Sequence, residues 1–415
     1  MEFLVEEALA GTIPSIEVRA RAAGCAVVDF DIEDGKGFQD DIFGMWDAAR
    51  QTGPFFLSTA GPGFWVFTSY ELCSEANTRP DLFSNETLEV FRRQDHVMPR
   101  MLPIQLDPPE HMKYRNILTS LFTPAAANKH EERFRAICRQ LFDRLAQERA
   151  FDFMAEVARP LPSSFFLGLM GISEDRTPEI TDSLIKATFL THADDPDGSV
   201  RQSCTAQVVA AIIDLIAARR ARPQKDLMSE IITREVDGRP LSDDELMRIG
   251  ILLANAGVET TGGVLGYAFR HLADHPAHRA AIISNPVLGK SATEEFLRVF
   301  AVAANSRTAV QDFDFHGCPV RKGDRVVVGL ISANRDPAVF GDPEAVMLDR
   351  WPNRHMTFGS GPHHCLGAHI ARLEIRISLE EWHRRIPDYH VAPGFVPHHH
   401  VATTHSFTSL PLIIG

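Results

Sequence analysis

The chain has 415 residues, 44% of them hydrophobic and 23% charged, which is an ordinary globular composition with ample length for a large core. A formal net charge of −13 argues against nucleic acid as a partner. The six cysteines are scattered and form no CxxC pair, so they favour a reducing compartment over a disulfide framework.

No linker, internal repeat or low-complexity tract divides the sequence, so we expect a single domain over residues 1–415. Within it, residues 1–40 are mixed in character and are predicted to lie irregularly over the surface. The acidic N-terminus lacks the features of a signal peptide, and no run approaches the roughly 18 apolar residues of a membrane-spanning helix. We therefore expect a soluble, monomeric, cytoplasmic protein without a membrane partner.

The first clear elements follow residue 40. Residues 42–52 are predicted to form a helix, and residues 55–60 and 64–69 two strands of a hairpin around a Gly-Pro-Gly turn. Residues 70–77 are predicted to be helical. Residues 86–103 are less regular and carry Met98 and Met101, a pattern that suits a flexible substrate cover and a plain surface loop equally well.

A basic pair lies on the next predicted helix. Asp107 before Pro108-Pro109 is a typical helix start, and His111 and Arg115 are four residues apart, so they share one helical face. On its own, such a pair is a solvated basic face. Residues 130–147, 154–171, 180–190 and 200–222 follow as helices, the last two separated by a polar turn.

The longest predicted helix carries polar groups at its centre. Ser242 and Glu245 form a capping-box pattern, and the helical pattern then runs to about Asp274 without a proline. Its middle holds Glu259 and Thr260 beside small residues. A carboxylate and a hydroxyl in the interior are costly unless water or function compensates them. A capped or water-linked polar pair in a kinked helix is the simpler alternative.

The next helix contains Glu295 and Arg298, a pair three residues apart that by itself indicates only a minor surface salt bridge. Arg307 then opens a β-rich segment with predicted strands at 310–316 and 325–329. His355 precedes Phe358 by three residues and leads into the most distinctive stretch of the chain.

That stretch is TFGSGPHHCLG at residues 357–367, whose glycines and proline predict a tight loop rather than a helix or a strand. An amphipathic helix follows directly, so Cys365 lies at a helix N-terminus, where N–H groups and the helix dipole stabilise a thiolate. An anionic sulfur in such a loop suits the fifth ligand position of a haem iron. The alternative is a buried free cysteine in a glycine-rich turn.

These motifs together resemble the cytochrome P-450 family of haem-thiolate monooxygenases. The order is that of the family: DPPEH at 107–111, AGVET at 256–260, EFLR at 295–298, the Arg307 segment, ANRDP at 333–337 and FGSGPHHCLG at 358–367. The resemblance runs from about residue 26 to the end and is closest in pattern to the soluble bacterial class that includes the camphor hydroxylase. It implies a mainly α fold with a smaller β portion.

The resemblance also implies a role for each motif. Cys365 would be the axial ligand of haem b, and Glu259 and Thr260 would organise water and protons for oxygen activation. Glu295 and Arg298 would brace the segment before the cysteine loop. The haem propionates and the haem loop would be held by His111, Arg115, Arg307, His355, Phe358, Gly359 and Gly367.

By the same resemblance, one oxygen atom of O2 is inserted into a small apolar substrate, a terpenoid such as a bicyclic monoterpene or a norisoprenoid. Electrons would come from a [2Fe–2S] ferredoxin and its flavin reductase, docking on a basic surface that includes Lys113, Arg115, Arg354 and Arg372. Candidate substrate-lining positions are Met98, Met101, Leu252, Asn255, Ala256, Ala303, Thr403 and Thr404.

Two other classes stay open: a peroxide-using haem-thiolate peroxygenase or isomerase, and a non-catalytic haem-thiolate gas sensor. The Glu259-Thr260 pair speaks against the first, and the lack of an attached partner or DNA-binding module against the second. His398, His399 and His400 are consecutive, so their side chains point in different directions and do not predict a metal site.

Overall fold

The computed structural model describes residues 15–33, 35–88, 90, 99–190, 194–257, 259–402 and 404–415. The helices of this part of the chain are α1 (Ile16–Ala22), α2 (Lys36–Asp40), α3 (Ile42–Thr52), α4 (Tyr70–Thr78), α5 (Glu110–Thr119), α6 (Pro124–Asn128), α7 (Glu131–Leu145), the π-helix η1 (Met154–Ala158), α8 (Pro160–Met170), α9 (Thr177–Phe189), α10 (Ser199–Ala221), α11 (Leu227–Ile232), α12 (Asp243–Ala256), α13 (Thr260–Asp274), α14 (Pro276–Ser284), α15 (Leu288–Val299), α16 (Leu330–Ala333), the 3₁₀-helix η2 (Gly361–His363) and α17 (Ala368–His383).

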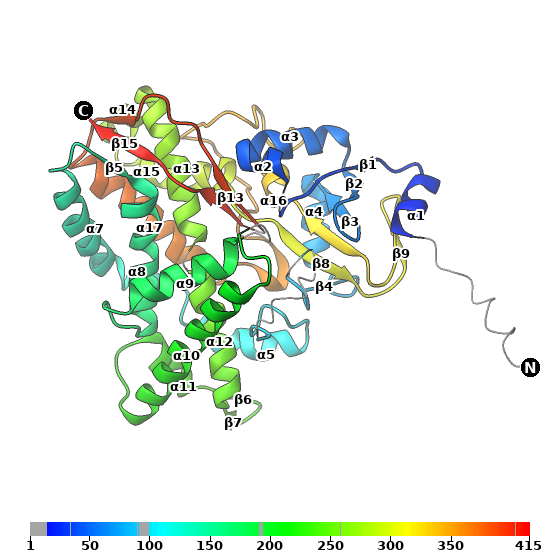
Figure 1. Cartoon of the computed structure of the whole chain (residues 1–415), viewed down its shortest axis with the longest axis horizontal. Helices are drawn as coiled ribbons and strands as arrows, with labels where there is room; N and C mark the ends of the chain where they lie inside the picture. Colours follow the sequence, from blue (N-terminus) through cyan, green and yellow to red (C-terminus); the bar gives the residue numbers. More distant parts are fainter. Residues whose placement is uncertain are drawn as a thin grey trace, which may run out of the picture.

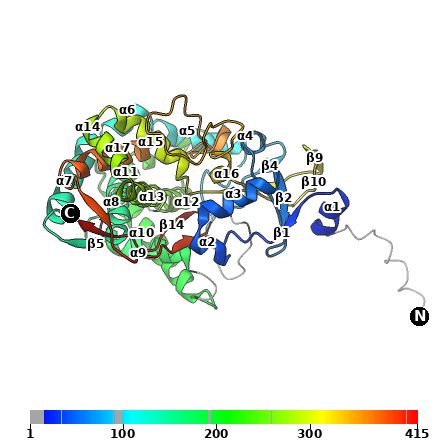
Figure 2. The ribbon, with the colours of Figure 1, turned by 90° about the horizontal axis from the view of Figure 1, so that it is seen from above.

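The strands are β1 (Val27–Val28), β2 (Phe55–Ser58), β3 (Phe64–Phe67), β4 (Phe83–Ser84), β5 (Ala150–Asp152), β6 (Glu235–Val236), β7 (Arg239–Pro240), β8 (Asn305–Ala309), β9 (Phe313–Phe315), β10 (Cys318–Val320), β11 (Arg325–Val328), β12 (Tyr389–Val391), β13 (His399–Val401), β14 (His405–Phe407) and β15 (Pro411–Ile414). The largest sheet has the order β1-β2-β3-β11-β8-β4. Figures 1 and 2 both show it at one end of the molecule, with most helices gathered at the other. The predicted mainly helical fold with a smaller β portion is confirmed.

Local predictions in the first third of the chain are also confirmed. The helix predicted at residues 42–52 is α3, and the predicted hairpin is the antiparallel pair β2–β3, with Phe55 opposite Phe67. Its turn requires left-handed backbone at Gly61 and Gly63, whose φ angles are 56° and 83°. The two faces of the hairpin are both covered, since Trp65 belongs to the hydrophobic cluster that includes α4 and Val66 to the cluster that includes α3.

The N-terminal segment differs from its prediction. Within the described part of residues 1–40, Phe30, Ile32 and Phe38 are buried, and the Phe30 ring packs edge-on against Trp46 with centroids 5.1 Å apart. Burying such large aromatic side chains stabilises the segment against the domain. The segment is therefore part of the core, although its composition predicted an irregular surface segment.

The long central helix is not continuous. Helix α12 begins at the predicted capping box of Ser242 and Glu245 but ends at Ala256, and α13 begins at Thr260. The Thr260 hydroxyl donates a hydrogen bond to the Ala256 carbonyl at 3.1 Å, an acceptor that a regular helix offers to the backbone N–H of residue 260. The helix is therefore interrupted beside Glu259, without any proline.

Two helical stretches, α10 and residues 243–274, are long and apolar enough to cross a membrane by length and composition alone. This differs from the expectation that no such run exists. In the apolar 18-residue window of each stretch, 44% and 71% is buried, and a core helix of a folded domain meets the same criterion. The α12–α13 stretch contributes Leu246, Ile249, Leu265 and Phe269 to the largest hydrophobic cluster.

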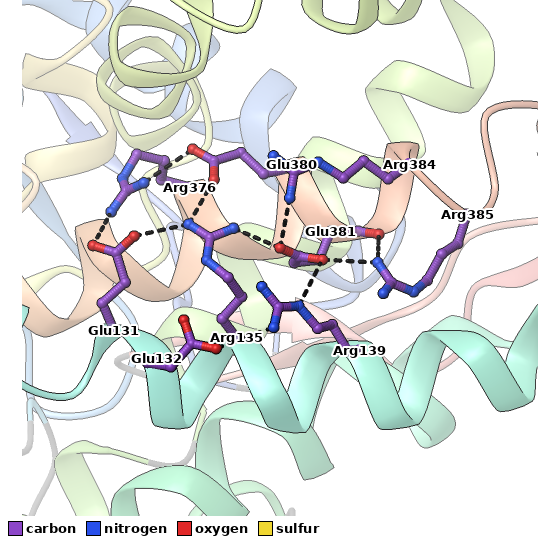
Figure 3. A network of polar contacts seen from close by, with 9 residues as sticks. All are labelled: Glu131, Glu132, Arg135, Arg139, Arg376, Glu380, Glu381, Arg384 and Arg385. Carbon is purple, nitrogen blue, oxygen red and sulfur yellow. Dashed lines mark hydrogen bonds and ion pairs between the residues drawn. The ribbon is translucent and has the colours of Figure 1, made fainter.

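An ion-pair network fastens α17, the helix that follows Cys365, to α7 (Figure 3). At its centre Glu381, only 1% exposed, accepts from Arg135 at 2.6 Å and from Arg384 and Arg385, each at 2.7 Å. Burial opposes the charge of Glu381, but Arg135 and Arg385 hold the pKa of its carboxyl below the usual value. Arg135 and Arg376 extend the network to Glu131 and Glu380.

Replacing Glu381 by Gln should lower the free energy of unfolding by about 2 kcal/mol, because half-buried arginines lose their shared carboxylate. A urea titration measures this. The loss should shrink in acid, since a carboxyl with a depressed pKa stabilises the fold above its unfolded pKa and stops doing so as pH falls. Glu132→Gln is the control: Glu132 is 75% exposed, so a change within about 0.5 kcal/mol is expected. Equal effects of both variants would contradict a role for burial.

Candidate active site

The cysteine loop is shaped by glycines and anchored to three helices. Gly359 and Gly361 have φ angles of 69° and 70°, and a Cβ at Gly361 would lie 2.5 Å from the Asn77 carbonyl of α4. The Cys365 N–H donates to the Phe358 carbonyl at 2.8 Å, closing the loop. Thr357 Oγ1 donates to the Leu297 carbonyl of α15 at 2.7 Å. These contacts therefore fix the backbone conformation of the loop where it leads into α17.

The Cys365 sulfur has the surroundings of a metal-binding thiolate. Among the free cysteines of the described chain, Cys365 alone is exposed, yet enough protein surrounds it that burial is the main influence on its thiol and raises its pKa. The backbone N–H groups of Gly367 and Ala368 and the charges of Arg115 and Arg372 act in the opposite direction. These donors and charges act in favour of a sulfur anion and oppose the larger effect of burial, so that the pKa of the thiol stays above its usual value.

A cluster of four nitrogen-bearing side chains, two of them buried and two partly buried, forms no salt bridge within the described part of the chain. It consists of His111 and Arg115 on α5, Arg307 on β8, and His363 in the cysteine loop. The His111 and His363 rings lie 4.2 Å apart, and His111 Nδ1 and His363 Nε2 have no hydrogen-bond partner among the described residues. Buried donors without partners are costly, so the cluster fits an anionic ligand such as a carboxylate.

The pKa values of the cluster agree with a site for an anionic ligand. Burial, with help from Arg115, lowers the pKa of His111 to about 4, and burial with His111, Arg307 and Arg115 lowers that of His363 to about 3. Burial also lowers the pKa of the Arg307 guanidinium to about 10. In each case burial disfavours the positively charged form of the group, and an anion beside the group would favour that form again.

His355 does not belong to this cluster, in contrast to its prediction. Its Nε2 lies 2.9 Å from a Glu294 carboxylate oxygen, and its Nδ1 accepts from the Thr357 N–H at 3.3 Å, so both ring nitrogens are engaged. His363, which was not among the predicted site residues, lies beside His111 instead. The sequence did contain an indication of His363, because two histidines directly precede Cys365. In the structure, the turn at Gly361 brings this part of the loop against α4.

Glu259 lies at the break between α12 and α13 with its side chain 6% exposed. Neither carboxylate oxygen has a hydrogen-bond partner meeting normal geometry among the described residues. Burial raises the pKa of Glu259 to about 7, and the charge of Arg159 and the Ser406 hydroxyl limit the rise. Such a carboxyl changes protonation near neutral pH. Thr260 directly follows it, and Ala256, one turn earlier, is exposed.

The Glu295–Arg298 pair is fully buried rather than superficial. Two hydrogen bonds of 2.8 and 2.9 Å join the side chains, and both are 0% exposed. Arg298 also donates to the carbonyls of Asn334, Pro343 and Ala345. The pair therefore ties α15 to the segment that precedes the cysteine loop, which is the bracing contact expected from the motif.

The predicted substrate-lining positions are only partly accounted for. Met98 and Thr403 lie outside the described residues. Ala303 and Thr404 face each other in an isolated β-bridge, and Met101 is buried. Leu252 is half-buried, and Asn255 has its Oδ1 3.5 Å from the Thr188 hydroxyl of α9. Asn255 therefore has a polar neighbour in the protein itself.

The family model described as "Cytochrome P450" matches residues 199–382. A "Probable cytochrome P450 127A1" of Sinorhizobium fredii is 35% identical over 83% of both chains, and a "Steroid C26-monooxygenase" of Mycolicibacterium smegmatis is 32% identical over 80% of this chain and 82% of its own length. The crystal structure of CYP101C1 aligns with a TM-score of 0.85 and 31% identity, covering 94% of this chain and 97% of that one. With the thiolate loop, the buried ion pair and the interrupted helix already described, this likeness identifies the chain as a member of the cytochrome P450 family, a bacterial-type cytochrome P450 monooxygenase.

Proposed function

We propose that the chain hydroxylates a small apolar terpenoid, a bicyclic monoterpene or a norisoprenoid, in the cytoplasm, with O2 and with electrons from a ferredoxin. The observation that carries the haem-thiolate chemistry is the environment of Cys365, an accessible sulfur at a helix N-terminus facing N–H groups and two arginines. Support for the substrate class is the likeness to the CYP101C1 structure and to that of CYP101J2, which share 31% and 30% identity with this chain.

The residues fit haem b. Cys365 would hold its iron, and His111, Arg115, Arg307 and His363 would hold its two propionates, because buried ring nitrogens of both histidines have no hydrogen-bond partner among the described residues and the two arginines lie close by. Phe358, Gly359 and Gly367 would form the loop beneath it. When bound, haem supplies O2 binding and oxygen transfer, and a thiolate ligand favours O–O cleavage.

Glu259 and Thr260 would donate and accept the protons that oxygen activation requires. A carboxyl with a pKa of about 7 both gives and takes a proton near neutral pH, which is the property that general acid–base catalysis needs. The Thr260 hydroxyl, held by the Ala256 carbonyl, has its oxygen available to accept a hydrogen bond. Together they would deliver protons from the protein to the reacting oxygen rather than from bulk water.

The proposed ferredoxin surface is only partly free in this structure. Lys113 binds Asp237 at 2.7 Å, and Arg372 binds Glu294 at 2.7 Å and packs over the Phe358 ring. Arg115 donates to the His364 carbonyl, whereas Arg354 is exposed. A negatively charged ferredoxin would therefore compete with internal acids at two of the four positions, and added salt should weaken docking.

The substrate class is tested by titrating the ferric protein with monoterpenes and ionones and following its Soret band. A low-to-high-spin shift at micromolar concentrations is expected for at least one terpenoid. Steroids form the comparison set, because a relative at 32% identity is named as a steroid monooxygenase. A shift with steroids and none with terpenoids would overturn the terpenoid proposal while leaving the monooxygenase assignment intact.

The exchange of His355 for His363 can be tested by alanine substitution. His363→Ala should weaken haem retention by roughly fivefold to tenfold, the effect of losing one charge-assisted hydrogen bond of about 1–1.4 kcal/mol. His355→Ala should leave haem retention within about twofold, because His355 is bound to Glu294. The rate of haem transfer to a scavenging apoprotein measures both. The reverse ranking would restore His355 as the propionate donor.

A further inference from the structure

The interruption at Glu259 is surrounded by elements that approach α13 unusually closely. A Cβ at Gly262 would lie 2.4 Å from the Ala158 carbonyl, and one at Gly263 would lie 2.7 Å from the His405 carbonyl. Glycines at these positions thus allow the η1–α8 junction and strand β14 to pack directly on the first turn of α13. Glu259, Arg159 and Ser406 are brought together by these contacts.

Arg159 is fixed within this junction. Its Nη2 donates to the Phe407 carbonyl at 2.8 Å and to the Thr408 carbonyl at 2.9 Å, at the end of β14. Its Nε is buried and has no hydrogen-bond partner among the described residues. Arg159 is therefore bound to carbonyl oxygens rather than to a carboxylate, and it retains an unused donor in the interior.

The charge of Arg159 lowers the pKa values of two different groups. It lowers the pKa of Glu259 against the effect of burial, and it contributes to lowering the pKa of His400, whose ring stacks on Phe189 at the end of α9 with centroids 4.9 Å apart. The charge of Arg159 therefore acts both on the carboxyl at the helix break and on a ring that stacks at the end of α9. The two groups it influences come from different parts of the sequence.

The other titratable groups around the break do not supply a positive charge near neutral pH. Burial lowers the pKa of His400 to about 4 and that of His405 to about 3, and it lowers the pKa of His399 as well. From α17, Glu374 approaches Thr261, and burial raises its pKa to about 8. These groups are therefore largely neutral, whereas an arginine stays charged at every working pH.

We propose that Arg159 is a positioning residue for Glu259: its guanidinium, held on the end of β14, is the fixed positive charge that keeps the Glu259 carboxylate oriented and available as it loses and regains its proton. The inference rests on the proposed role of Glu259. It adds a residue from outside the recognised motifs, contributed by the π-helix junction before α8. Substrate does not need to touch Arg159 for this role.

The test compares the pH dependence of coupling, the fraction of consumed NADH that appears as product, in variants that bind haem normally. Arg159→Gln removes the charge but keeps a donor for the β14 carbonyls, and Arg159→Lys keeps the charge. The midpoint assigned to Glu259 should rise by about one pH unit in Arg159→Gln, the low end of the effect of a neighbouring opposite charge. Arg159→Lys should restore most of the wild-type midpoint.

Two comparisons isolate the interaction. In a Glu259→Gln background the Arg159→Gln change should no longer move the profile, because the group that Arg159 acts on is gone. Arg144→Gln is the matched control: Arg144 pairs with Glu156 at 2.8 Å, is 54% exposed and should leave the midpoint in place. The infrared band of the protonated Glu259 carboxyl, identified by its loss in Glu259→Gln, gives the same midpoint without turnover.

The outcomes separate the two claims. If Glu259→Gln leaves both the coupling profile and the carboxyl band unchanged, the proposed role of Glu259 falls, and this inference falls with it. If Glu259→Gln changes them but Arg159→Gln leaves the midpoint where it is in the wild type, the inference alone is overturned. A rise in Arg159→Gln that Arg159→Lys reverses supports it.

Discussion

The position of the Cys365 sulfur is the constraint on which this structure depends, because the haem-thiolate chemistry that the family implies requires this sulfur as an anion. Burial by itself favours the neutral thiol of Cys365, so the fold has to provide compensating donors and charges at one point. It does so with the N-terminus of α17 and with arginines from α5 and α17 itself. The backbone conformation of the loop must therefore be fixed, and the left-handed glycines allow that conformation. The position of α17 must be fixed as well, and the ion-pair network centred on Glu381 holds α17 against α7.

The same opposition between burial and charge governs two other groups of residues, one of nitrogen donors and one centred on a carboxyl. In the cluster of His111, Arg115, Arg307 and His363, burial lowers the pKa values of the histidines and of Arg307, and no salt bridge among the described residues offsets it. Around Glu259 the deficiency is reversed, since a buried carboxyl without hydrogen-bond partners has its pKa raised to about 7. The proposed monooxygenase chemistry uses both: the cluster would hold the anionic groups of the cofactor, and Glu259 would supply a carboxyl that changes its charge near neutral pH.

Sequence patterns predicted the features that depend on local chemistry. The helix at 42–52, the β2–β3 hairpin, the Ser242–Glu245 capping box and the thiolate loop follow from spacing, turn residues and caps, which act within a few residues. The resemblance to a family supplied the fold, which no local pattern could. Two features needed tertiary structure, because they depend on residues distant in sequence: the burial of Phe30 and Phe38, and the place of His363 beside His111. The helix interruption beside Glu259 accompanies a local hydrogen bond from Thr260 to Ala256, and no proline marks it in the sequence.

The most direct test of the account is the carbon monoxide difference spectrum of the reduced protein, compared between Cys365→Ala and Cys25→Ala. Cys25 is a free cysteine that is only partly exposed and lies far from the loop in sequence. The account predicts a thiolate-type Soret band in the wild type and in Cys25→Ala, and its loss in Cys365→Ala. A thiolate-type band that persists in Cys365→Ala would contradict the assignment of Cys365 as the iron ligand and, with it, the whole arrangement of the site.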